Sequence, residues 1–262
     1  MTEPSSPALH GKPLSSSNII AVGTTGLIYA LDNAHVLKRC PPVSDPFIHQ
    51  AFTIELRAYN QLGQHPRIAT VHETTEKAIV LERGECLRRR LQRQSESEPI
   101  PLRTKLQWAK EAAEGLCYIH ERGIIQGDVG CHNLILTQSG IKYIDFAGSG
   151  INNEPALVAY EWCSYRPDPT QHPDAAASIR TDIFAFGSAL FEIEAGCVPY
   201  HELQATLDIY PLMRRVEGLF GARQYPDLEG LVLGGVIRGC WDGRYERMEE
   251  VIADVGGCLD SI

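Results

Sequence analysis

The sequence contains Gln126-Gly127-Asp128-Val129-Gly130-Cys131-His132-Asn133-Leu134-Ile135-Leu136, followed after a short link by Lys142-Tyr143-Ile144-Asp145-Phe146-Ala147-Gly148. An aspartate at 128, an asparagine at 133 and a second aspartate behind an apolar strand-like run together supply hard oxygen donors. Phosphoryl transfer needs such a set, because one carboxylate orients the attacking hydroxyl while an amide and a carboxylate hold Mg²⁺. Loop aspartates can also serve as turn formers, but the ordered set of three favours the chemical interpretation.

Two features nearer the N-terminus could serve a nucleotide. The run Gly23-Thr24-Thr25-Gly26 separates two strand-like segments, and glycines let backbone N–H groups approach phosphate oxygens. Taken alone it is an ordinary turn, and it is not a Walker A loop because no Gly-Lys-Ser/Thr follows. Lys38 lies in the next strand-like segment, where a lysine is usually a surface residue, and Glu55 lies in the following predicted helix. A buried lysine–glutamate pair is costly unless it has a function, and holding phosphates is one such function.

The remaining sequence divides into a strand-rich part and a helix-rich part. Residues 1–18 are rich in proline and serine, which indicates a flexible leader. Strand-like runs and one amphipathic helix, predicted to stop at Gly63, follow up to residue 83. A long periodic helix that ends at Gly123 belongs to the second part, whose later sequence is mainly helical. We therefore predict an α+β fold, in which a small β-rich lobe (19–83) sits on a larger helical lobe (84–262).

Composition argues against several classes of protein. The chain has 262 residues, and its 24 Lys and Arg against 33 Asp and Glu give a net charge of −9, which disfavours nucleic acid or an anionic membrane as a partner. No apolar run is long enough to span a bilayer, and the N-terminal residues lack the pattern of a secretory signal. We therefore expect a cytoplasmic location, with the nucleus as the alternative. The eight cysteines contain no C-x-x-C pair, so free thiols are expected.

Taken in order, these motifs resemble those of the eukaryotic-type protein kinases, over about residues 19–255. The run Ala21-Val22-Gly23-Thr24-Thr25-Gly26-Leu27-Ile28 is similar to the glycine-rich loop G-x-G-x-x-G-x-V of that family, with alanine at the first glycine. The pair Lys38 and Glu55 resembles the phosphate-binding lysine and its helix partner. Asp128, Asn133 and Asp145-Phe146-Ala147 resemble, respectively, the catalytic-loop aspartate, the metal-binding asparagine and the D-F-G motif.

The resemblance implies the two-lobed protein-kinase fold, with transfer of the γ-phosphoryl group of ATP, in the presence of Mg²⁺, to a protein hydroxyl. Serine or threonine is favoured over tyrosine. Asp128 would be the catalytic base, supported by Lys38 and Glu55, and Asn133 and Asp145 would be the metal ligands. Leu81 resembles the gatekeeper, and the hinge backbone at 82–84 would bind the adenine edge. The implied nucleotide contacts are Ala21, Val22, Gly23, Thr24, Thr25, Gly26, Ile28, Lys38, Leu81, Glu82 and Arg83.

Later segments extend the resemblance through the C-terminal part. Ser164-Tyr165-Arg166-Pro167-Asp168 is similar to the segment that ends in A-P-E, and residues 181–187 are similar to the start of the central helix of the large lobe. Cys240-Trp241 followed by Arg247 resembles the last family block, in which Arg247 would pair with Asp168. The compact build and the Q-G-D-x-x-C-H-N loop are similar to small kinases that are abundant in filamentous fungi.

Three departures from the family pattern bear on regulation and specificity. Gln126 and Gly127 replace the histidine and arginine of H-R-D. Because that arginine binds a phosphorylated activation segment in the family, activity is expected not to need such phosphorylation, and control by a regulatory partner stays open. Gly130 replaces the lysine that serine/threonine kinases carry two residues after the aspartate, which removes a charge near the γ-phosphate. Ala147 adds a methyl group where the D-F-G backbone bends.

Two alternative functions stay open. A pseudokinase would use the fold to bind a nucleotide or another protein without catalysis, although a degraded kinase more often has lost at least one key residue. A small-molecule kinase similar to the aminoglycoside or choline kinases would share the G-D-x-x-x-x-N loop, but the segments at 167–168, 182–187 and 240–241 favour the protein-kinase class. A solvated basic helix face, opposed by Glu96 and Glu98, is expected from Arg88, Arg89, Arg90 and Arg93.

Overall fold

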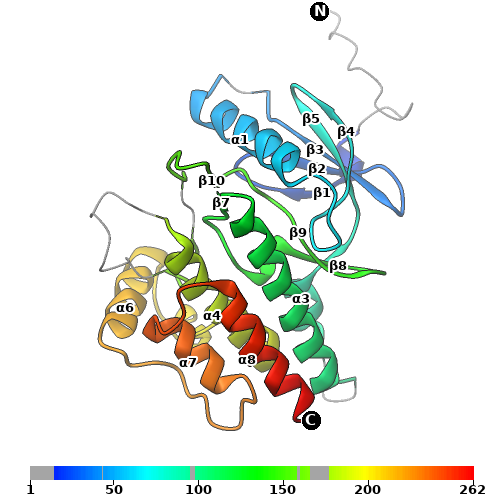
Figure 1. Cartoon of the computed structure of the whole chain (residues 1–262). Helices are drawn as coiled ribbons and strands as arrows, with labels where there is room; N and C mark the ends of the chain where they lie inside the picture. Colours follow the sequence, from blue (N-terminus) through cyan, green and yellow to red (C-terminus); the bar gives the residue numbers. More distant parts are fainter. Residues whose placement is uncertain (1–14, 43, 95–97, 158–159, 166–176) are drawn as a thin grey trace, which may run out of the picture.

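The computed structural model places the chain in two lobes, a small N-terminal one and a larger C-terminal one (Figure 1). It describes residues 15–42, 44–94, 98–157, 160–165 and 177–262. Most of the predicted leader lies outside the described residues, and Ser16–Asn18 form a short 3-10 turn. The predicted α+β fold, with strands in the first lobe and helices in the second, is confirmed.

The small lobe is built on a five-stranded antiparallel sheet with the strand order β1-β2-β3-β5-β4. Its two faces bury different residues, because side chains alternate along a strand. Leu37 and Val80 belong to a small cluster on the outer face, whereas Ile79, which pairs with Lys38, belongs to the main core. The strands are Ile19–Val22 (β1), Leu27–Ala30 (β2), His35–Arg39 (β3), Val71–Thr75 (β4) and Ala78–Glu82 (β5).

Helix α1, Pro46–Leu62, follows β3 and lies next to the sheet (Figure 1). It begins where the Asp45 side chain accepts a hydrogen bond from the Phe47 N–H group, with proline at the first position. It ends at Gly63, whose φ of 61° suits glycine, so the predicted stop is confirmed. The buried side of the helix carries Glu55 into the interior among apolar neighbours.

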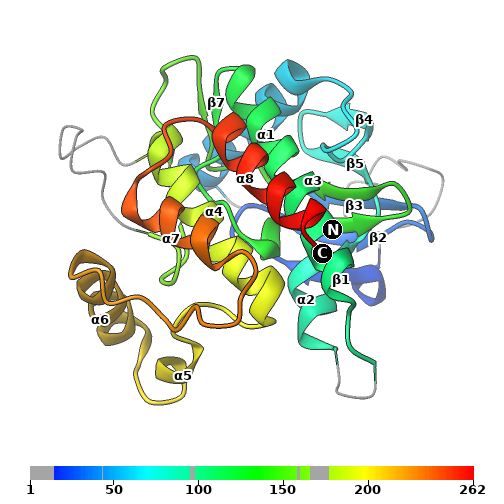
Figure 2. The same cartoon turned by 60° about the horizontal axis from the view of Figure 1, so that its bottom comes forward.

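The large lobe is mainly helical, and its core surrounds α3 and α4. Helix α3 packs against α4 and α8, while α4 also packs against α7 (Figures 1 and 2). The fully buried Trp241 of α7 contacts Phe191 of α4 and Phe220 of α6. The helices are Leu87–Gln92 (α2), Leu102–Glu121 (α3), Ile179–Ala195 (α4), His201–Gln204 (α5), Ile209–Gly221 (α6), Gly234–Asp242 (α7) and Met248–Asp260 (α8).

Short strands position the segments that contain Asn133 and Asp145. Strand β6 (Glu85–Cys86) pairs with β8 (Leu134–Thr137), and β8 pairs with β9 (Gly140–Tyr143). Asn133 precedes β8, and Asp145 follows β9. Because β8 and β9 are antiparallel neighbours, these two side chains leave the sheet at the same end. The 3-10 turn η3 covers Cys131–Asn133, and the two-residue strands β7 (Ile124–Ile125) and β10 (Gly150–Ile151) pair with each other.

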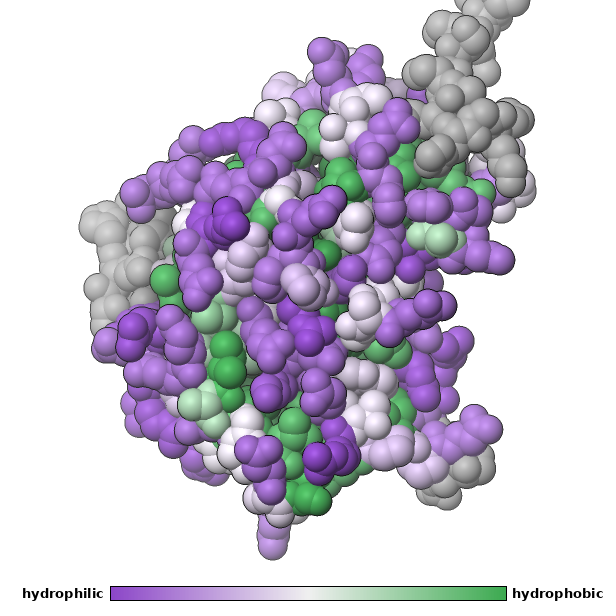
Figure 3. Space-filling model, turned by 45° about the vertical axis from the view of Figure 1, so that its right-hand side comes forward, coloured by the Kyte–Doolittle hydropathy of each residue, from purple (hydrophilic) through white to green (hydrophobic). Residues whose placement is uncertain are grey.

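The surface and the cysteines agree with a globular interior. The face shown in Figure 3 is mostly hydrophilic, with hydrophobic residues in scattered patches. In the described part of the chain, no helix combines the length and the apolar character needed to cross a bilayer. All eight cysteines are free thiols, as the sequence predicts, and each is at least partly buried.

Candidate active site

Lys38 of β3 holds two carboxylates that come from different parts of the fold. Its Nζ atom lies 2.7 Å from Glu55 Oε2 of α1 and 2.8 Å from Oδ1 of Asp145, which follows β9. Burial acts to lower the pKa of Lys38, but the charges of Asp145 and Glu55 outweigh it and raise that pKa. Burial also raises the pKa of Glu55, to about 7. The lysine–glutamate pair predicted from the sequence is formed, and the ammonium group is charged and fixed.

Asp145 keeps part of its carboxylate accessible. Its side chain is 41% exposed although Lys38 contacts one oxygen, so the other oxygen can bind a cation. Burial acts to raise the pKa of Asp145, but the Lys38 ammonium outweighs it and lowers that pKa, which keeps the carboxylate ionised. The backbone has a φ of 60°, in the left-handed region that side-chain-bearing residues adopt rarely and mostly at functional sites.

Asp128 and Asn133 are held together ahead of β8. The Nδ2 group of Asn133 donates to the backbone carbonyl of Asp128 and to its Oδ2 atom, each at 2.9 Å. Because the nitrogen is used in this way, the Oδ1 atom of Asn133 is the one left for a metal. The Oδ1 atom of Asp128 is buried and has no hydrogen-bond partner among the described residues, while the Asp128 side chain as a whole is 23% exposed. A carboxylate at this position can accept the proton of a hydroxyl group.

A buried aspartate fixes the backbone of this loop, a role that the sequence analysis did not assign. Asp182 of α4 accepts the N–H groups of Gln126 at 2.8 Å and of Gly127 at 3.0 Å. His120 of α3 contacts the same carboxylate through Nε2 at 2.9 Å. The φ of Gly127 is 77°, which glycine adopts without strain. An aspartate at the start of the mostly apolar run 182–191 was the signal in the sequence, since aspartates are almost never fully buried unless paired.

The glycine-rich run forms the turn between β1 and β2. The Gly23 N–H group donates to the Gly26 carbonyl at 2.9 Å, and a bulge interrupts the strand pairing near Ala21. Gly26 lies against Lys38, because a Cβ atom at 26 would be 2.8 Å from Lys38 Cγ. Ile28 pairs with Lys38 across β2 and β3. The run is thus a hairpin turn that also covers Lys38. Of the other residues predicted to contact the nucleotide here, Val22 and Thr24 are exposed and Thr25 is half-buried.

The chain passes into the large lobe directly after β5. Leu81 is buried, and the strand register places it on the same side of the sheet as Lys38. The Glu82 carboxylate forms an ion pair at 2.6 Å with a lysine of β9. The Arg83 N–H group already donates to the Ala34 carbonyl at 2.8 Å. Any contact of Arg83 with adenine, as predicted from the sequence, would therefore use its carbonyl or its side chain.

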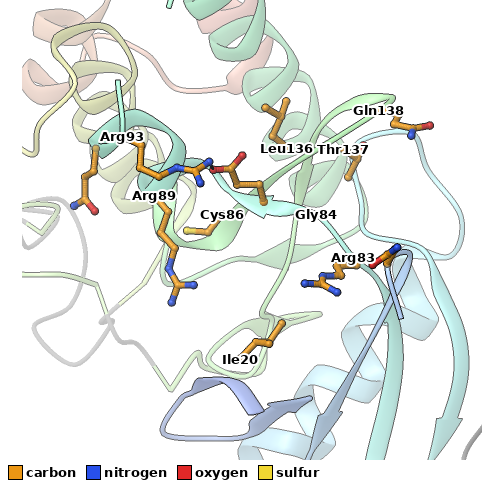
Figure 4. A pocket seen from close by; sticks show the side chains of 12 residues that line it. Ile20, Arg83, Gly84, Cys86, Arg89, Arg93, Leu136, Thr137 and Gln138 are labelled. Carbon is orange, nitrogen blue, oxygen red and sulfur yellow. Dashed lines mark hydrogen bonds and ion pairs between the residues drawn. The ribbon is translucent and has the colours of Figure 1, made fainter. Parts of the chain in front are cut away.

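A cavity of about 1070 Å³ opens beside the hinge. Figure 4 shows it between β1, the hinge, α2 and the β8–β9 turn, with Ile20 and Gln138 among its lining residues. Arg89 of α2 extends toward Ile20, whereas Arg93 of the same helix turns to Glu85 and forms an ion pair with it. The cavity therefore adjoins the hinge, where the sequence predicts that the adenine binds, and positive charges line its α2 side.

Helix α2 corrects one prediction. Arg88, predicted to lie on a solvated face, is largely buried and lies 2.6 Å from Glu161 Oε1 and 2.6 Å from Glu192 Oε1. The physical reason is that Glu192 belongs to the buried helix α4, where a carboxylate without a partner charge is costly. Arg89 and Arg93 are exposed, as the sequence predicts.

Some residues of the predicted motifs lie outside the described residues. These are Glu96, Arg166, Pro167 and Asp168, so the pairing of Arg247 with Asp168 stays a prediction. Cys240 and Trp241, by contrast, are buried in α7 as parts of the large-lobe core.

The donor set fits Mg²⁺. Asn133 and Asp145 offer an amide oxygen and a carboxylate oxygen at the same end of two neighbouring strands. Mg²⁺ prefers oxygen ligands and is usually bound by one or two carboxylates together with phosphates. The Lys38 ammonium beside Asp145 adds a second positive group of the kind that phosphate oxygens need.

The family described as protein tyrosine and serine/threonine kinase matches residues 32–247. The chain therefore belongs to the protein kinase family, in agreement with the resemblance of its motifs. The match includes Lys38, Glu55, Asp128, Asn133 and Asp145, and it begins after the glycine-rich turn.

Curated relatives come from bacteria and from eukaryotes. A probable serine/threonine-protein kinase of Streptomyces coelicolor is 26% identical over 236 residues, which cover 82% of this chain and 34% of the relative. Serine/threonine-protein kinase PknB of Mycolicibacterium smegmatis is 24% identical over 247 residues, covering 86% of this chain and 38% of the relative. Protein-tyrosine kinase 6 of Mus musculus is 27% identical over 170 residues, which cover 60% of this chain and 37% of the relative. The matched region is thus less than two fifths of each of these relatives.

Proposed function

We propose that this chain is an ATP- and Mg²⁺-dependent protein kinase that phosphorylates serine or threonine hydroxyls. The observation that carries the proposal is the contact of one buried ammonium, Lys38 Nζ, with Glu55 at 2.7 Å and Asp145 at 2.8 Å. Such a buried cluster is costly unless it serves a function. Its place beneath Gly26 sets the ammonium where phosphates held by the glycine-rich turn would lie.

Each residue of the site has a part in this reaction. The backbone N–H groups of residues 23–26 would hold the phosphates from one side, and Lys38 would hold them from the other. Asn133 and Asp145 would bind Mg²⁺, which supplies charge neutralisation for the transferred phosphoryl group. Asp128, whose side chain is 23% exposed, would orient the substrate hydroxyl and accept its proton.

The relatives support serine and threonine over tyrosine. The two serine/threonine kinases match 82% and 86% of this chain, whereas the tyrosine kinase matches 60%. The presence of Lys38, Asp128, Asn133 and Asp145 favours catalysis over a pseudokinase. The match over residues 32–247 favours a protein substrate over a small molecule.

Transfer of label from ATP tests the proposal. The purified chain is incubated with γ-labelled ATP, Mg²⁺ and a mixture of generic protein substrates, and the labelled amino acids are identified after hydrolysis. We expect label on serine and threonine. Asp128→Asn should lower turnover by about 100-fold or more, because it removes the group that accepts the proton, while the affinity for ATP should barely change.

The controls separate the alternatives. Asp208→Asn, at an exposed aspartate whose side chain makes no cap hydrogen bond to α6, should keep wild-type turnover. ATP binding without transfer would favour a pseudokinase, and label on an aminoglycoside or choline but not on protein would favour a small-molecule kinase. Near wild-type turnover of Asp128→Asn would show that the assigned base is wrong.

A further inference from the structure

His132 contacts the carboxylate that the proposed function assigns as the base. Its Nε2 atom lies 3.2 Å from Asp128 Oδ2, and its Nδ1 atom lies 3.2 Å from Glu161 Oε2. Both ring nitrogens therefore face carboxylates, an arrangement that suits a ring with a proton on each nitrogen.

Gly130 makes room for this ring. A Cβ atom at position 130 would lie 2.6 Å from both Cε1 and Nδ1 of His132. The φ of Gly130 is −179°, an extended backbone that any residue adopts, so the backbone itself does not require glycine. Position 130 is also where the resemblance places the missing lysine. The His132 ring therefore lies in the space next to position 130, where the lysine of the family is missing.

Glu161, the second partner of the ring, is anchored firmly. Arg88 donates to it through two parallel hydrogen bonds, Nη1 to Oε1 and Nη2 to Oε2, each at 2.6 Å. The same guanidinium donates to Glu192 of α4 at 2.6 and 2.8 Å. Bidentate pairs of this kind fix geometry as well as charge. A series of alternating charges thus runs from the buried helix α4 to Asp128.

We infer that His132 is a positioning residue for the proposed phosphoryl transfer, holding the Asp128 carboxylate in the orientation that the substrate hydroxyl meets. The inference rests on the proposed function, because it assigns a role within the same site.

One oxygen of Asp128 makes the contacts that hold the carboxylate. Oδ2 is held by the Asn133 amide at 2.9 Å and by the His132 ring at 3.2 Å. Oδ1 is buried and has no hydrogen-bond partner among the described residues. Two contacts on one oxygen restrict rotation of the carboxylate, and a misplacement of about 1 Å in such a group can lower a rate about 100-fold.

Steady-state kinetics of three variants test the inference. His132→Ala should lower kcat by about tenfold or more with little change in the KM for ATP, since the ring touches the base and not the nucleotide. Gly130→Ala should cause a similar loss, because the new Cβ would displace the ring while His132 and Asp128 both remain. The double variant should be no slower than His132→Ala alone, because both changes remove the same interaction.

Rescue and a matched control distinguish positioning from a structural defect. His132→Gln, which can keep a donor toward Asp128, should recover part of the lost kcat. His201→Ala, at an exposed histidine of α5 that also faces a glutamate, should keep wild-type kinetics. The melting temperature of each variant is measured in parallel, and a kcat loss with an unchanged melting temperature supports positioning.

Other outcomes overturn the inference. Wild-type kcat in His132→Ala or in Gly130→Ala would do so, and so would losses that multiply in the double variant. If His132→Ala fails to fold, Gly130→Ala decides the question alone, because it keeps both charged side chains. A wild-type chain that transfers no phosphoryl group would overturn the proposed function, and this inference with it. An active wild type with an equally active His132→Ala would overturn this inference only.

Discussion

The side-chain amide of Gln126 donates to the backbone carbonyl of Asp145 at 3.1 Å, and its Oε1 atom accepts the N–H group of Asp128. One fully buried glutamine therefore joins the loop of the proposed base to a proposed metal ligand. Gln126 stands where the family has the histidine of H-R-D. Gln126 therefore links the two loops although the histidine of the family is absent.

Gln126→Ala should destabilise the protein measurably. The change removes two hydrogen bonds and takes the Gln126 side chain away from the part-buried Asp145 carbonyl and Asp128 N–H group, and an unpaired group of this kind costs about 1–3 kcal/mol when water cannot replace the partner. We therefore expect the free energy of unfolding, measured by urea denaturation, to fall by about 2 kcal/mol or more. Gln204→Ala, at an exposed glutamine of α5, should change it by less than about 0.5 kcal/mol. Equal stability of the two variants would contradict the linking role of Gln126.

ATP with Mg²⁺ should stabilise the folded chain. A ligand that binds the native state raises the free energy of unfolding by about 2.7 kcal/mol at a hundredfold excess over Kd, which increases the melting temperature. Lys38→Met should reduce this increase, because it removes the ammonium that we propose faces the phosphates. Asp145→Asn should remove the part of the increase that depends on Mg²⁺, measured by comparing ATP with Mg²⁺ and ATP with EDTA. An unchanged dependence on Mg²⁺ in Asp145→Asn would show that this residue does not bind the metal.

The parts of the fold and site that the sequence predicts depend on local signals. Gly63 ends α1 because a glycine there can adopt a φ of 61°, and that is visible as a glycine after an amphipathic run. Asn133 and Asp145 come together because two short apolar runs joined by a tight link must pair as a hairpin. The contact of Lys38 with Glu55 follows from the order of strand and helix, together with the known arrangement of the family.

The contacts that the sequence does not predict join residues far apart in the chain. Arg88, Glu161 and Glu192 are all charged, and charge alone predicts a solvated surface for each of them. Only the packing of α2 on the buried helix α4 decides that Glu192 needs an internal cation. The backbone N–H group of Arg83 is a similar case, since its bond to Ala34 depends on how the hinge meets the β2–β3 turn. No periodicity or spacing in the sequence encodes these relations.

Activity should not require phosphorylation of the segment 145–165. Gly127 has no side chain that could bind a phosphate, and its φ of 77° favours glycine. The structure describes four side-chain hydroxyls in this segment, of which Ser149, Tyr160 and Ser164 are buried and Tyr165 is half-buried. The Tyr160 hydroxyl donates to Asp182 at 2.8 Å.

Treatment with a phosphatase before the kinase assay measures this dependence. We expect unchanged turnover, with mass spectrometry showing that the segment carries no phosphate. Loss of turnover on treatment, followed by recovery when the segment is phosphorylated again, would contradict the prediction.

Glu161 should contribute to stability in a manner that depends on pH. Burial acts to raise the pKa of Glu161, but the hydrogen bonds from Arg88 and His132 outweigh it and lower that pKa from 4.5 to about 2. A carboxylate whose pKa is lower in the folded state contributes stability that is fully present above the unfolded pKa. That contribution is lost as the pH falls from about 4.5 to about 2. The lowering corresponds to at most about 3 kcal/mol, and the side chain is only 25% exposed, so screening by solvent is limited.

Urea denaturation of the wild type and of Glu161→Gln at several pH values between 7 and 3 measures this contribution. The variant should be less stable at pH 7, because its neutral amide removes one of the two carboxylates that face Arg88 and one of the two that face His132. The difference should shrink as the pH falls below about 4.5, since protonated Glu161 then resembles the glutamine. Glu154→Gln is the matched control: it breaks an exposed pair with Arg57, and such pairs contribute about 1 kcal/mol or less at any pH. The stability difference between the wild type and Glu161→Gln could instead stay constant down to pH 3. That result would contradict the prediction, because it would show that the negative charge of Glu161 does not cause the difference.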